Sequence, residues 1–508
     1  MMILVPLFVT FLVITLSYYF WHWTFWRRRG INGPPSIPVF GNKLSLVWPN
    51  ASVPLVLREW TKKYGTTYGI QDGIEQTLVT SDPEIVREVF LKQFENFYER
   101  KALVTNSPND PRVHVFNANG SRWKRLRTIS SPTFTSGNLR KLHGTIENSV
   151  LEIISHIERN SESPINFEDY YQEFTMDVIG RIAMGQTESR MFNNPMVKII
   201  ATRLNVLVTL LLTVRSILPG FMAKYLGFEV LSKLSSQKHP LIQIMETCEA
   251  AVVSRIQQRD KDLAAGIEPG DPIDFIDLFL DARSDELFDD AEFSKEHVKV
   301  SRQLTTDEII AQCFVFMIAG FDTTSIALSF TTHLLATHPE IQEKVQDEIA
   351  RECPNPTIDF DTLGRLTYID AVVKETLRLY PLASMVNSRR CVNETIIGDL
   401  KIEKGMYVAA DTWTLHCDKS LWGENAAEFV PERWLEGDVN KNNWIPFGHG
   451  PRQCIGMRLA LMEEKLLLAH LLRRYTIVPG TKTEKCEVTG PFIVRPASTW
   501  FNVVDRNT

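Results

Sequence analysis

The sequence predicts a mainly α-helical protein with a small β region, built as one large domain behind an N-terminal transmembrane helix. Apolar residues recur with helical periodicity over most of the chain, and short β-like patches are confined to residues 77–80, 396–402 and 406–410. The first 26 residues are apolar and long enough to cross a bilayer. The 508 residues could form two or three average domains, but the position of a glycine-rich cysteine loop near the C terminus is equally consistent with one.

The composition is that of a globular protein in a reducing compartment. Hydrophobic residues make up 44% of the chain and charged residues 23%, and the net charge of −6 argues against nucleic acid as a partner. The seven cysteines are odd in number and scattered, with no Cys-x-x-Cys pair. Neither a zinc site nor a disulfide framework is therefore indicated.

Residues 1–29 are interpreted as a single-pass membrane anchor. The apolar run has no acidic or strongly basic side chain, tyrosines and tryptophans crowd its end, and three arginines follow at 27–29. The positive-inside rule then keeps the rest of the chain cytosolic and the N terminus lumenal. A cleaved signal peptide is the alternative, and it is disfavoured because the charges follow the apolar run and no small-residue cleavage site is present.

Residues 30–42 are expected to form a stiff hinge before the body of the protein at 43–508. Three prolines in this segment cannot continue a helix and favour an extended linker. Within the body, the apolar segment 204–228 carries Arg215 and is broken by a Pro-Gly pair, so it is not expected to span a membrane. It is either a helix ending in a loop that dips into lipid or a buried core helix.

The most informative segment is 447–456, Phe-Gly-His-Gly-Pro-Arg-Gln-Cys-Ile-Gly, which presents Cys454 on a loop just ahead of a predicted helix. Gly448, Gly450 and Gly456 allow tight turns and close approach to a flat cofactor. The free amides and the positive end of the helix should favour ionisation of the sulfur. A single cysteine is more often a small buried apolar residue, so the spacing of the whole segment carries the interpretation as a metal ligand.

Two further residues of this segment suit a flat, anionic cofactor. Arg452 offers a planar fork of donors to an anionic group, and Phe447 offers an apolar face on which a macrocycle can rest. Every fixed position of Phe-x-x-Gly-x-Arg-x-Cys-x-Gly is matched, and the loop resembles that of the cytochrome P450 family, whose haem iron is held by a cysteine thiolate. The resemblance implies haem b with Cys454 as axial ligand, and O2 as co-substrate.

A long helix is predicted from a capping box at Thr305 to about Thr337. Its middle, 319–324, reads Ala-Gly-Phe-Asp-Thr-Thr, in which glycine and threonine weaken helical hydrogen bonding and Asp322 and Thr323 can hold water. Because splitting dioxygen consumes two protons, this pair suits proton delivery, whereas a polar kink without function is the alternative. The hexamer is similar to the family's (Ala/Gly)-Gly-x-(Asp/Glu)-Thr pattern, which implies catalytic roles for Asp322 and Thr323.

Glu375 and Arg378 lie three residues apart on one predicted helix face, close enough to pair. The apolar residues around them indicate burial, and a buried pair needs further partners to offset desolvation. The resemblance implies that Arg433 is that partner and completes a structural triad that supports the cysteine loop. Trp434, where the family commonly has phenylalanine, is expected to leave the triad intact.

Trp123 and Arg127 share one face of a predicted helix and direct an indole donor and a guanidinium at one target. The resemblance implies that this target is a haem propionate. A further propionate contact is expected from Arg389 or Arg390, with Arg389 preferred because of its position after the Glu-x-x-Arg helix.

A basic patch for an acidic electron donor is also conceivable on the same helix and the one after it. Its members would be Arg122, Lys124, Arg125, Arg140 and Lys141. Ordinary solvated surface charge is the alternative.

The resemblance covers nearly the whole chain and is strongest with the animal, xenobiotic-oxidising branch of microsomal P450s, including its invertebrate expansions. It implies a monooxygenase of the endoplasmic reticulum membrane that inserts one atom of O2 into a lipophilic substrate such as a xenobiotic, a steroid or a fatty acid. NADPH would act through a separate NADPH-cytochrome P450 reductase, because the chain has no flavin or nucleotide fingerprint. Cytochrome b5 as a second donor, regioselectivity and oligomeric state stay open. The expected substrate-facing stretches are 112–119, 314–321, 383–386 and 491–493.

Two rival functions are kept. One is a haem-thiolate isomerase or lyase that rearranges lipid peroxides without a reductase, and the other is a non-catalytic haem-binding sensor. Neither needs protons delivered to bound oxygen, so the presence of Asp322 and Thr323 argues against both.

Overall fold

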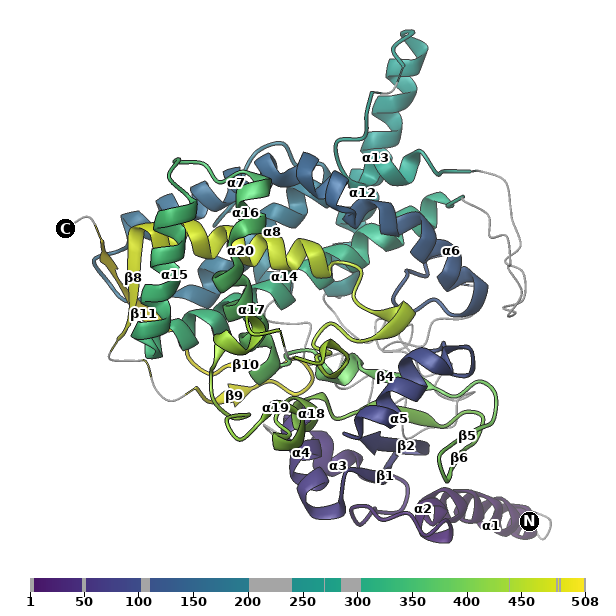
Figure 1. Cartoon of the computed structure of the whole chain (residues 1–508). Coiled ribbons are helices and arrows are strands. Elements are labelled where there is room, and N and C mark those ends of the chain that lie inside the picture. The colour runs from purple at the N-terminus through teal and green to yellow at the C-terminus, as the bar shows by residue number, and fades with distance from the viewer. Residues whose placement is uncertain are drawn as a thin grey trace.

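The computed structural model describes residues 4–47, 52–101, 110–200, 240–268, 270–284, 303–437, 439–480, 483 and 486–506. A large helical part is joined to a smaller β-rich part, and the N-terminal helix lies beside the β-rich part at the edge of the molecule (Figure 1). The prediction of a mainly α protein with a small β region is confirmed. The apolar segment 204–228 lies outside the described residues.

The helices and strands have the following bounds. The α-helices are α1 (Leu4–Trp23), α2 (Phe25–Arg28), α3 (Lys43–Val47), α4 (Val53–Tyr64), α5 (Pro83–Arg87), α6 (Gly120–Ser130), α7 (Ser136–Arg159), α8 (Phe167–Met184), α12 (Pro240–Ala264), α13 (Phe275–Leu280), α14 (Thr306–Thr337), α15 (Pro339–Glu352), α16 (Phe360–Arg365), α17 (Thr367–Leu379), α18 (Thr412–His416), α19 (Lys419–Trp422) and α20 (Met457–Arg474). The strands are β1 (Thr67–Asp72), β2 (Glu75–Thr80), β3 (Ile165–Asn166), β4 (Ser388–Arg390), β5 (Thr395–Ile397), β6 (Leu400–Ile402), β7 (Tyr407–Ala410), β8 (Tyr475–Pro479), β9 (Val488–Thr489), β10 (Arg495–Pro496) and β11 (Trp500–Asp505). Two 3₁₀ turns used below are η5 (Pro431–Trp434) and η7 (Gly450–Arg452).

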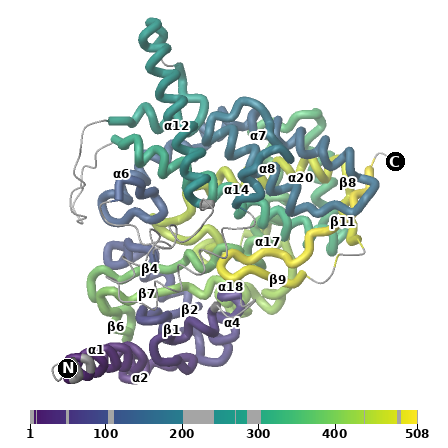
Figure 2. Tube along the Cα trace, turned by 180° about the vertical axis from the view of Figure 1, so that it is seen from behind, coloured from purple at the N-terminus to yellow at the C-terminus, as the bar shows by residue number. Residues whose placement is uncertain are grey.

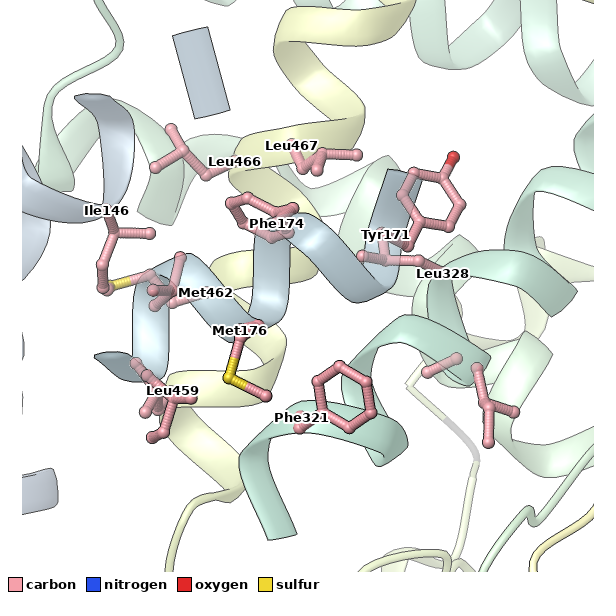
Figure 3. Close-up of a cluster of buried hydrophobic side chains, with 14 of the residues drawn as sticks. Ile146, Tyr171, Phe174, Met176, Phe321, Leu328, Leu459, Met462, Leu466 and Leu467 are labelled. Carbon is pink, nitrogen blue, oxygen red and sulfur yellow. The ribbon is translucent and has the colours of Figure 1, made fainter. Parts of the chain in front are cut away.

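The central helix is α14, which begins at the predicted capping box. The Thr305 hydroxyl accepts from the amide of Glu308, and the Glu308 side chain accepts from the amide of Thr305. The helix is apolar on most of its surface because α8, α12, α17 and α20 pack around it. Figure 3 shows this core, with Met176 of α8 beside Phe321 of α14 and with Met462 of α20 nearby.

The β-rich part is built on one sheet of order β1-β2-β7-β4. β1 and β2 form an antiparallel hairpin, whereas β7, from much later in the chain, pairs with β2 in parallel. This sheet and the β5-β6 hairpin contain the three patches predicted from the sequence. Strand β1 and the strands β8 to β11 were not predicted, and of these β9 and β10 have only two residues each and carry little periodicity. Figure 2 shows β9 and β11 beside the helical part.

The N-terminal segment is bound to the sheet. The buried Trp26 indole donates to the Ile70 carbonyl at 2.8 Å, and a Cβ added to Gly69 would lie 2.2 Å from the Trp26 ring. In the proline-rich segment, the Asn42 side chain donates to the Pro35 carbonyl at 3.1 Å. Asn42 Oδ1 also accepts from the amide of Gln71 at 2.8 Å, so α2 and the proline-rich segment are both joined to β1.

Within the described part of the chain, one helix has the length and apolar composition of a membrane span, and this helix is α14. Of its apolar window, 61% is buried inside the protein. α14 is therefore a core helix.

Candidate active site

Cys454 lies on a loop that backbone hydrogen bonds close just before α20. The amide of Cys454 donates to the Phe447 carbonyl at 2.8 Å, and the amide of Gly448 donates to the Ile445 carbonyl at 3.0 Å. These bonds bring the first residue of the loop back to the cysteine. The sulfur consequently has a defined position relative to the start of α20.

The glycines of the loop differ in what the backbone requires of them. Gly450 has a φ of 72°, and a Cβ there would lie 2.0 Å from the Phe90 carbonyl oxygen, so no other residue fits. Gly448 also has a positive φ, of 76°. The expected need for a glycine turn at Gly456 is wrong, because its φ is −86° and the nearest atom to a Cβ would be 3.7 Å away.

The Cys454 sulfur experiences opposing influences. The Cys454 side chain is accessible to solvent, yet protein atoms lie around it on all sides. The sulfur therefore borders an interior space that solvent can enter. Burial is the largest influence and raises the pKa of the thiol, while the amides of Gly456 and Met457 and the charges of Arg100 and Arg127 lower it. The expectation that the loop alone makes this sulfur ionise readily is wrong, since desolvation outweighs the helix end. A bound metal cation favours the thiolate outright.

Four arginines, here called the arginine cluster, surround this space: Arg100, Arg127, Arg389 and Arg452. Arg389 and Arg452 are 1% exposed. Burial lowers the pKa of all four, that of Arg100 to about 10, and their mutual repulsion adds to this effect in Arg389 and Arg452. Among the described residues, none of the four forms an ion pair with a carboxylate. So many unpaired guanidinium groups in one place are costly unless an anion joins them.

Several donors of the arginine cluster are free. Arg452 donates to the carbonyls of Tyr98 and Ala118 at 2.9 and 2.8 Å. In the part of the chain that is described, however, its Nη1 and the Nε atoms of Arg100 and Arg389 are buried without a hydrogen-bond partner. Trp123 packs flat on this group, with its ring centre 4.3 Å from the Arg452 guanidinium.

The two alternatives for the second propionate contact have different surroundings. Arg390 is half-exposed and pairs with Glu99 at 2.8 Å. Arg389, the preceding residue in β4, is buried, lies over the Phe90 ring and donates to the His449 carbonyl at 3.3 Å. The geometry therefore favours Arg389 as the residue that faces the cysteine loop.

The residues of the expected basic patch are largely engaged elsewhere. Arg122 and the buried Arg125 both pair with Glu308 at the start of α14, at 3.0 and 2.8 Å. Arg140 pairs with Asp361. Arg122 and Arg125 are therefore turned into the protein and do not belong to an exposed basic patch, whereas such a patch stays a prediction for Lys124, Arg140 and Lys141.

Glu375, Arg378 and Arg433 meet in a buried cluster. Arg378 donates to both carboxylate oxygens of Glu375 at 2.8 Å, and Arg433 donates to one of them at 2.9 Å. The carboxylate also accepts from the amide of Val430 and from the Trp434 indole, at 3.1 and 2.9 Å. Tryptophan at 434 therefore adds a donor that phenylalanine would lack. Every lone pair of the buried carboxylate has a donor nearby, as a buried charge requires.

Two connections join this triad to the cysteine loop. The amide of Ile445 donates to His416 Nε2 at 2.9 Å, so Nδ1 carries the proton and donates to the Arg378 carbonyl at 3.0 Å. A row of aromatic rings runs from Trp434 through Trp444 to Phe447, with centroids 5.4 and 5.9 Å apart. The triad thereby fixes the residues that lead into the loop.

Asp322 and Thr323 occupy the middle of α14, which is continuous through the hexamer. The Thr323 hydroxyl donates to the Ala319 carbonyl at 2.7 Å, and Thr175 of α8 donates to the Phe321 carbonyl at 2.8 Å. Asp322 Oδ2 accepts from Arg495 at 2.8 Å, while Oδ1 is buried without a partner among the described residues. The two side chains thus lie on adjacent residues but do not bond to each other.

Sequence reasoning missed Arg100 and His416. Arg100 donates to the Arg452 carbonyl and approaches Cys454 closely enough to lower the pKa of the thiol. Arg100 lies in the segment Tyr-Glu-Arg-Lys, which matches no motif. The only signal in the sequence is the pair of adjacent basic residues, Arg100 and Lys101. His416 lies in a short helix with no periodic signal.

A cofactor that combines a metal ion with anionic groups would satisfy the sulfur and the arginine cluster together, and haem, with its iron and two propionates, is such a cofactor. The donors present therefore fit a haem-thiolate protein. The cytochrome P450 family model matches residues 31–501, and the chain belongs to this family of haem-thiolate monooxygenases.

Curated relatives that resemble the chain over nearly its whole length include several from one nematode. Cytochrome P450 CYP13A1 of Caenorhabditis elegans is 48% identical over 99% of both chains. CYP13A10 and CYP13A5 of the same species are 47% and 48% identical over 97% of each chain. These similarities place the chain in an invertebrate expansion of the family.

Proposed function

We propose that this monooxygenase is anchored in the endoplasmic reticulum membrane, takes electrons from NADPH through a separate reductase, and inserts one oxygen atom into a lipophilic substrate. The arginine cluster around Cys454 is the observation that carries the assignment of its haem site. Cys454 would ligate the iron, and the free donors of Arg100, Arg389 and Arg452 would bind the propionates together with Trp123 and Arg127. When bound, haem supplies the binding and reductive activation of O2.

The residues of α14 would manage the protons that this chemistry consumes. Thr323 Oγ1 already donates to a helix carbonyl, so its lone pairs can accept from a water molecule. Asp322 Oδ1 is a free acceptor in a buried place, and burial raises the pKa of this carboxyl. A carboxyl with a raised pKa is better able to carry a proton at neutral pH.

The triad would hold the loop that carries the iron ligand. Glu375, Arg378 and Arg433 would act on the loop through His416 and the tryptophan row. Phe447, at the end of that row, would contact the face of the macrocycle. Gly448 and Gly456 would let the loop and the start of α20 approach the macrocycle.

Residues 1–29 would form the membrane anchor, 30–42 the hinge and 43–508 the catalytic domain. α1 carries large apolar side chains that no protein covers, among them Leu7, Phe11 and Ile14 at 61%, 67% and 63% exposure. Such a surface is stable in lipid and costly in water. The Trp26 contact with the sheet would then set the orientation of the catalytic domain on the membrane.

The substrate would be bound by stretches that meet in space although they are far apart in sequence. The His114 and Phe314 rings lie 6.1 Å apart, which joins stretch 112–119 to α14. The amide of Val494 donates to the Leu382 carbonyl at 3.0 Å, which joins the C-terminal turn to the segment before 383–386. Aromatic and aliphatic residues predominate in these stretches, so a lipophilic substrate fits them.

The test is incorporation of labelled dioxygen. Membrane-reconstituted protein, NADPH and the reductase are incubated with a panel of lipophilic xenobiotics, steroids and fatty acids, and products are analysed by mass spectrometry. One labelled oxygen atom per product, dependent on NADPH and reductase, is expected. Conversion of a lipid peroxide without label or reductase would contradict the proposal, as would a thiolate-haem spectrum without turnover of any panel compound.

A further inference from the structure

Arg495 joins two carboxylates that are mostly buried and come from different helices. Its Nη2 donates to Asp322 Oδ2 of α14 at 2.8 Å, and its Nη1 donates to Glu168 Oε1 of α8 at 2.9 Å. All three side chains are less than one-fifth exposed. The Arg495 guanidinium is thus shared between Asp322, which has a proposed part in proton delivery, and Glu168, which has none.

The charges are unbalanced within this group. Burial raises the pKa of Asp322 and of Glu168, and Arg495 opposes the shift in both. Asp322 and Asp169 raise the pKa of Glu168 further by repulsion. Among the described residues, Arg495 from β10 is the charged group that bonds Asp322. The other charged groups close to this pair are Glu168 and Asp169 from α8. A single cation cannot fully stabilise two desolvated carboxylates, so a change in one of them alters the other.

The position of Arg495 in the chain connects this group to the substrate-facing turn. Arg495 begins β10, directly after stretch 491–493 and after Val494, whose amide bonds Leu382. The backbone of Arg495 pairs with Thr489 in the β9-β10 hairpin. A displacement of the 491–493 turn would therefore move the Arg495 guanidinium relative to α14.

We propose that Arg495 is a positioning residue for proton delivery, which holds Asp322 through the bond shared with Glu168 and links that bond to the substrate-facing turn. This inference rests on the proposed function of Asp322. In it, Arg495 fixes the carboxylate through Oδ2 and leaves Oδ1 as the acceptor. Contact between a bound substrate and the 491–493 turn changes the strength of the ion pair between Arg495 and Asp322.

The first test needs no substrate. The infrared carbonyl band of protonated Asp322 is followed against pH in the ferric holoenzyme and is identified by subtraction of Asp322→Asn. Removal of the cation in Arg495→Met should raise the midpoint by about one to three pH units, the usual effect of a nearby opposite charge. Arg495→Lys, which keeps the charge but cannot bridge both carboxylates equally, should give a smaller rise. Glu168→Gln, which releases Arg495 to Asp322 alone, should give none.

The second test measures hydrogen peroxide released per NADPH oxidised in the enzyme reconstituted with reductase. Peroxide should rise in Arg495→Met towards the level of Asp322→Asn, and Arg495→Lys should restore part of the coupling. Arg474→Met is the matched control, because Arg474 also lies between carboxylates of two elements, Glu158 and Asp505, but more exposed than Arg495 and paired with neither Asp322 nor Glu168.

The outcomes separate this inference from the proposed function. A wild type without a thiolate-type carbon monoxide spectrum would contradict the proposed function. A wild type with that spectrum, in which Arg495→Met behaves like Arg474→Met in both tests, would contradict the role of Arg495 alone. An equal rise of the midpoint in Arg495→Met and Glu168→Gln would also contradict it, since loss of packing and not of charge would then be the cause.

Discussion

The amide of Cys454 lies 2.8 Å from the carbonyl oxygen of Phe447, and this single bond closes the loop on which the proposed iron ligand lies. The bond explains why the loop needs its glycines, because the chain must reverse direction between these two residues. It also means that whatever fixes Phe447 fixes the cysteine. Trp444 and, behind it, the Glu375 triad perform that function.

Cys454→Ala should abolish the thiolate-type carbon monoxide difference spectrum, because among the described cysteines Cys454 is the one whose thiol pKa the arginine cluster lowers. The spectrum of the reduced protein is the measurement. Cys353→Ala, a buried cysteine at the end of α15, is the control and should keep the wild-type spectrum. A normal spectrum in Cys454→Ala would refute the ligand assignment.

Thr323→Ala should increase peroxide release at the expense of product, because the hydroxyl that would position water beside Asp322 is lost. The ratio of peroxide to product per NADPH measures this effect. Thr331→Ala removes an equivalent hydroxyl, bonded to the Ala327 carbonyl at 2.9 Å, from the same helix and should leave the ratio unchanged. Equal coupling in the two variants would remove the proposed role of Thr323.

Glu375→Ala should destabilise the protein by about 3–5 kcal/mol, because it leaves two buried arginines without their shared carboxylate. Glu375→Gln should cost less, since the amide oxygen still accepts. Urea denaturation and the haem content per protein measure the two consequences. Glu352→Ala removes a partly exposed carboxylate that pairs with Arg351 and Arg365, and it should leave both quantities unchanged. Similar results for Glu352→Ala and Glu375→Ala would argue against a supporting role of the triad.

Gly450→Ala should lower haem retention more than its control Gly437→Ala. Both glycines have a positive φ, of 72° and 84°, so both variants carry the left-handed backbone cost of about 1–2 kcal/mol. Only at Gly450 would the new Cβ meet another backbone, the Phe90 carbonyl, whereas it would find open space at Gly437. The two variants are compared by their haem absorbance after gel filtration, and equal retention would show that the close approach to Phe90 is not required.

His416 should make the protein less stable in acid. Burial, assisted by the charge of Arg378, lowers the pKa of His416 to about 3 from an ordinary value of 6.5. Below pH 6.5 the unfolded chain binds a proton that the folded protein does not, so this contribution to stability falls by about 1.4 kcal/mol per pH unit until the folded pKa is reached.

His416→Asn tests this sign. The variant should be less stable than wild type near neutral pH, by about 1–3 kcal/mol, because the amide of Ile445 loses its acceptor. The difference should shrink as the pH falls, since the variant lacks the titrating group. Urea denaturation followed by tryptophan fluorescence at several pH values is the measurement, and a difference that grows in acid would contradict the assignment.

Local signals in the sequence were sufficient for much of the site. The capping box at Thr305 and Glu308, the cysteine loop and the spacing of Glu375 and Arg378 each lie within a few residues, where backbone geometry alone brings side chains together. Strands β2, β5, β6 and β7 were predicted because short apolar patches mark them. Strands β1, β3, β4 and β8 to β11 were not predicted, and of these β9 and β10 have only two residues each, too few to show periodicity.

The sequence by itself determined the family, and it predicted the loop of the proposed iron ligand and the proposed proton-delivery pair on α14, because each is written in contiguous residues. The tertiary structure alone decided which basic residues face the cofactor space. Arg125 turns to Glu308 and Arg390 to Glu99, whereas Arg100 and Arg389 remain without a carboxylate near Cys454. It also decided that Asp322 shares Arg495 with Glu168. The partner of each of these charged side chains depends on which other charges are buried close to it. Burial in turn is set by packing between segments that are hundreds of residues apart.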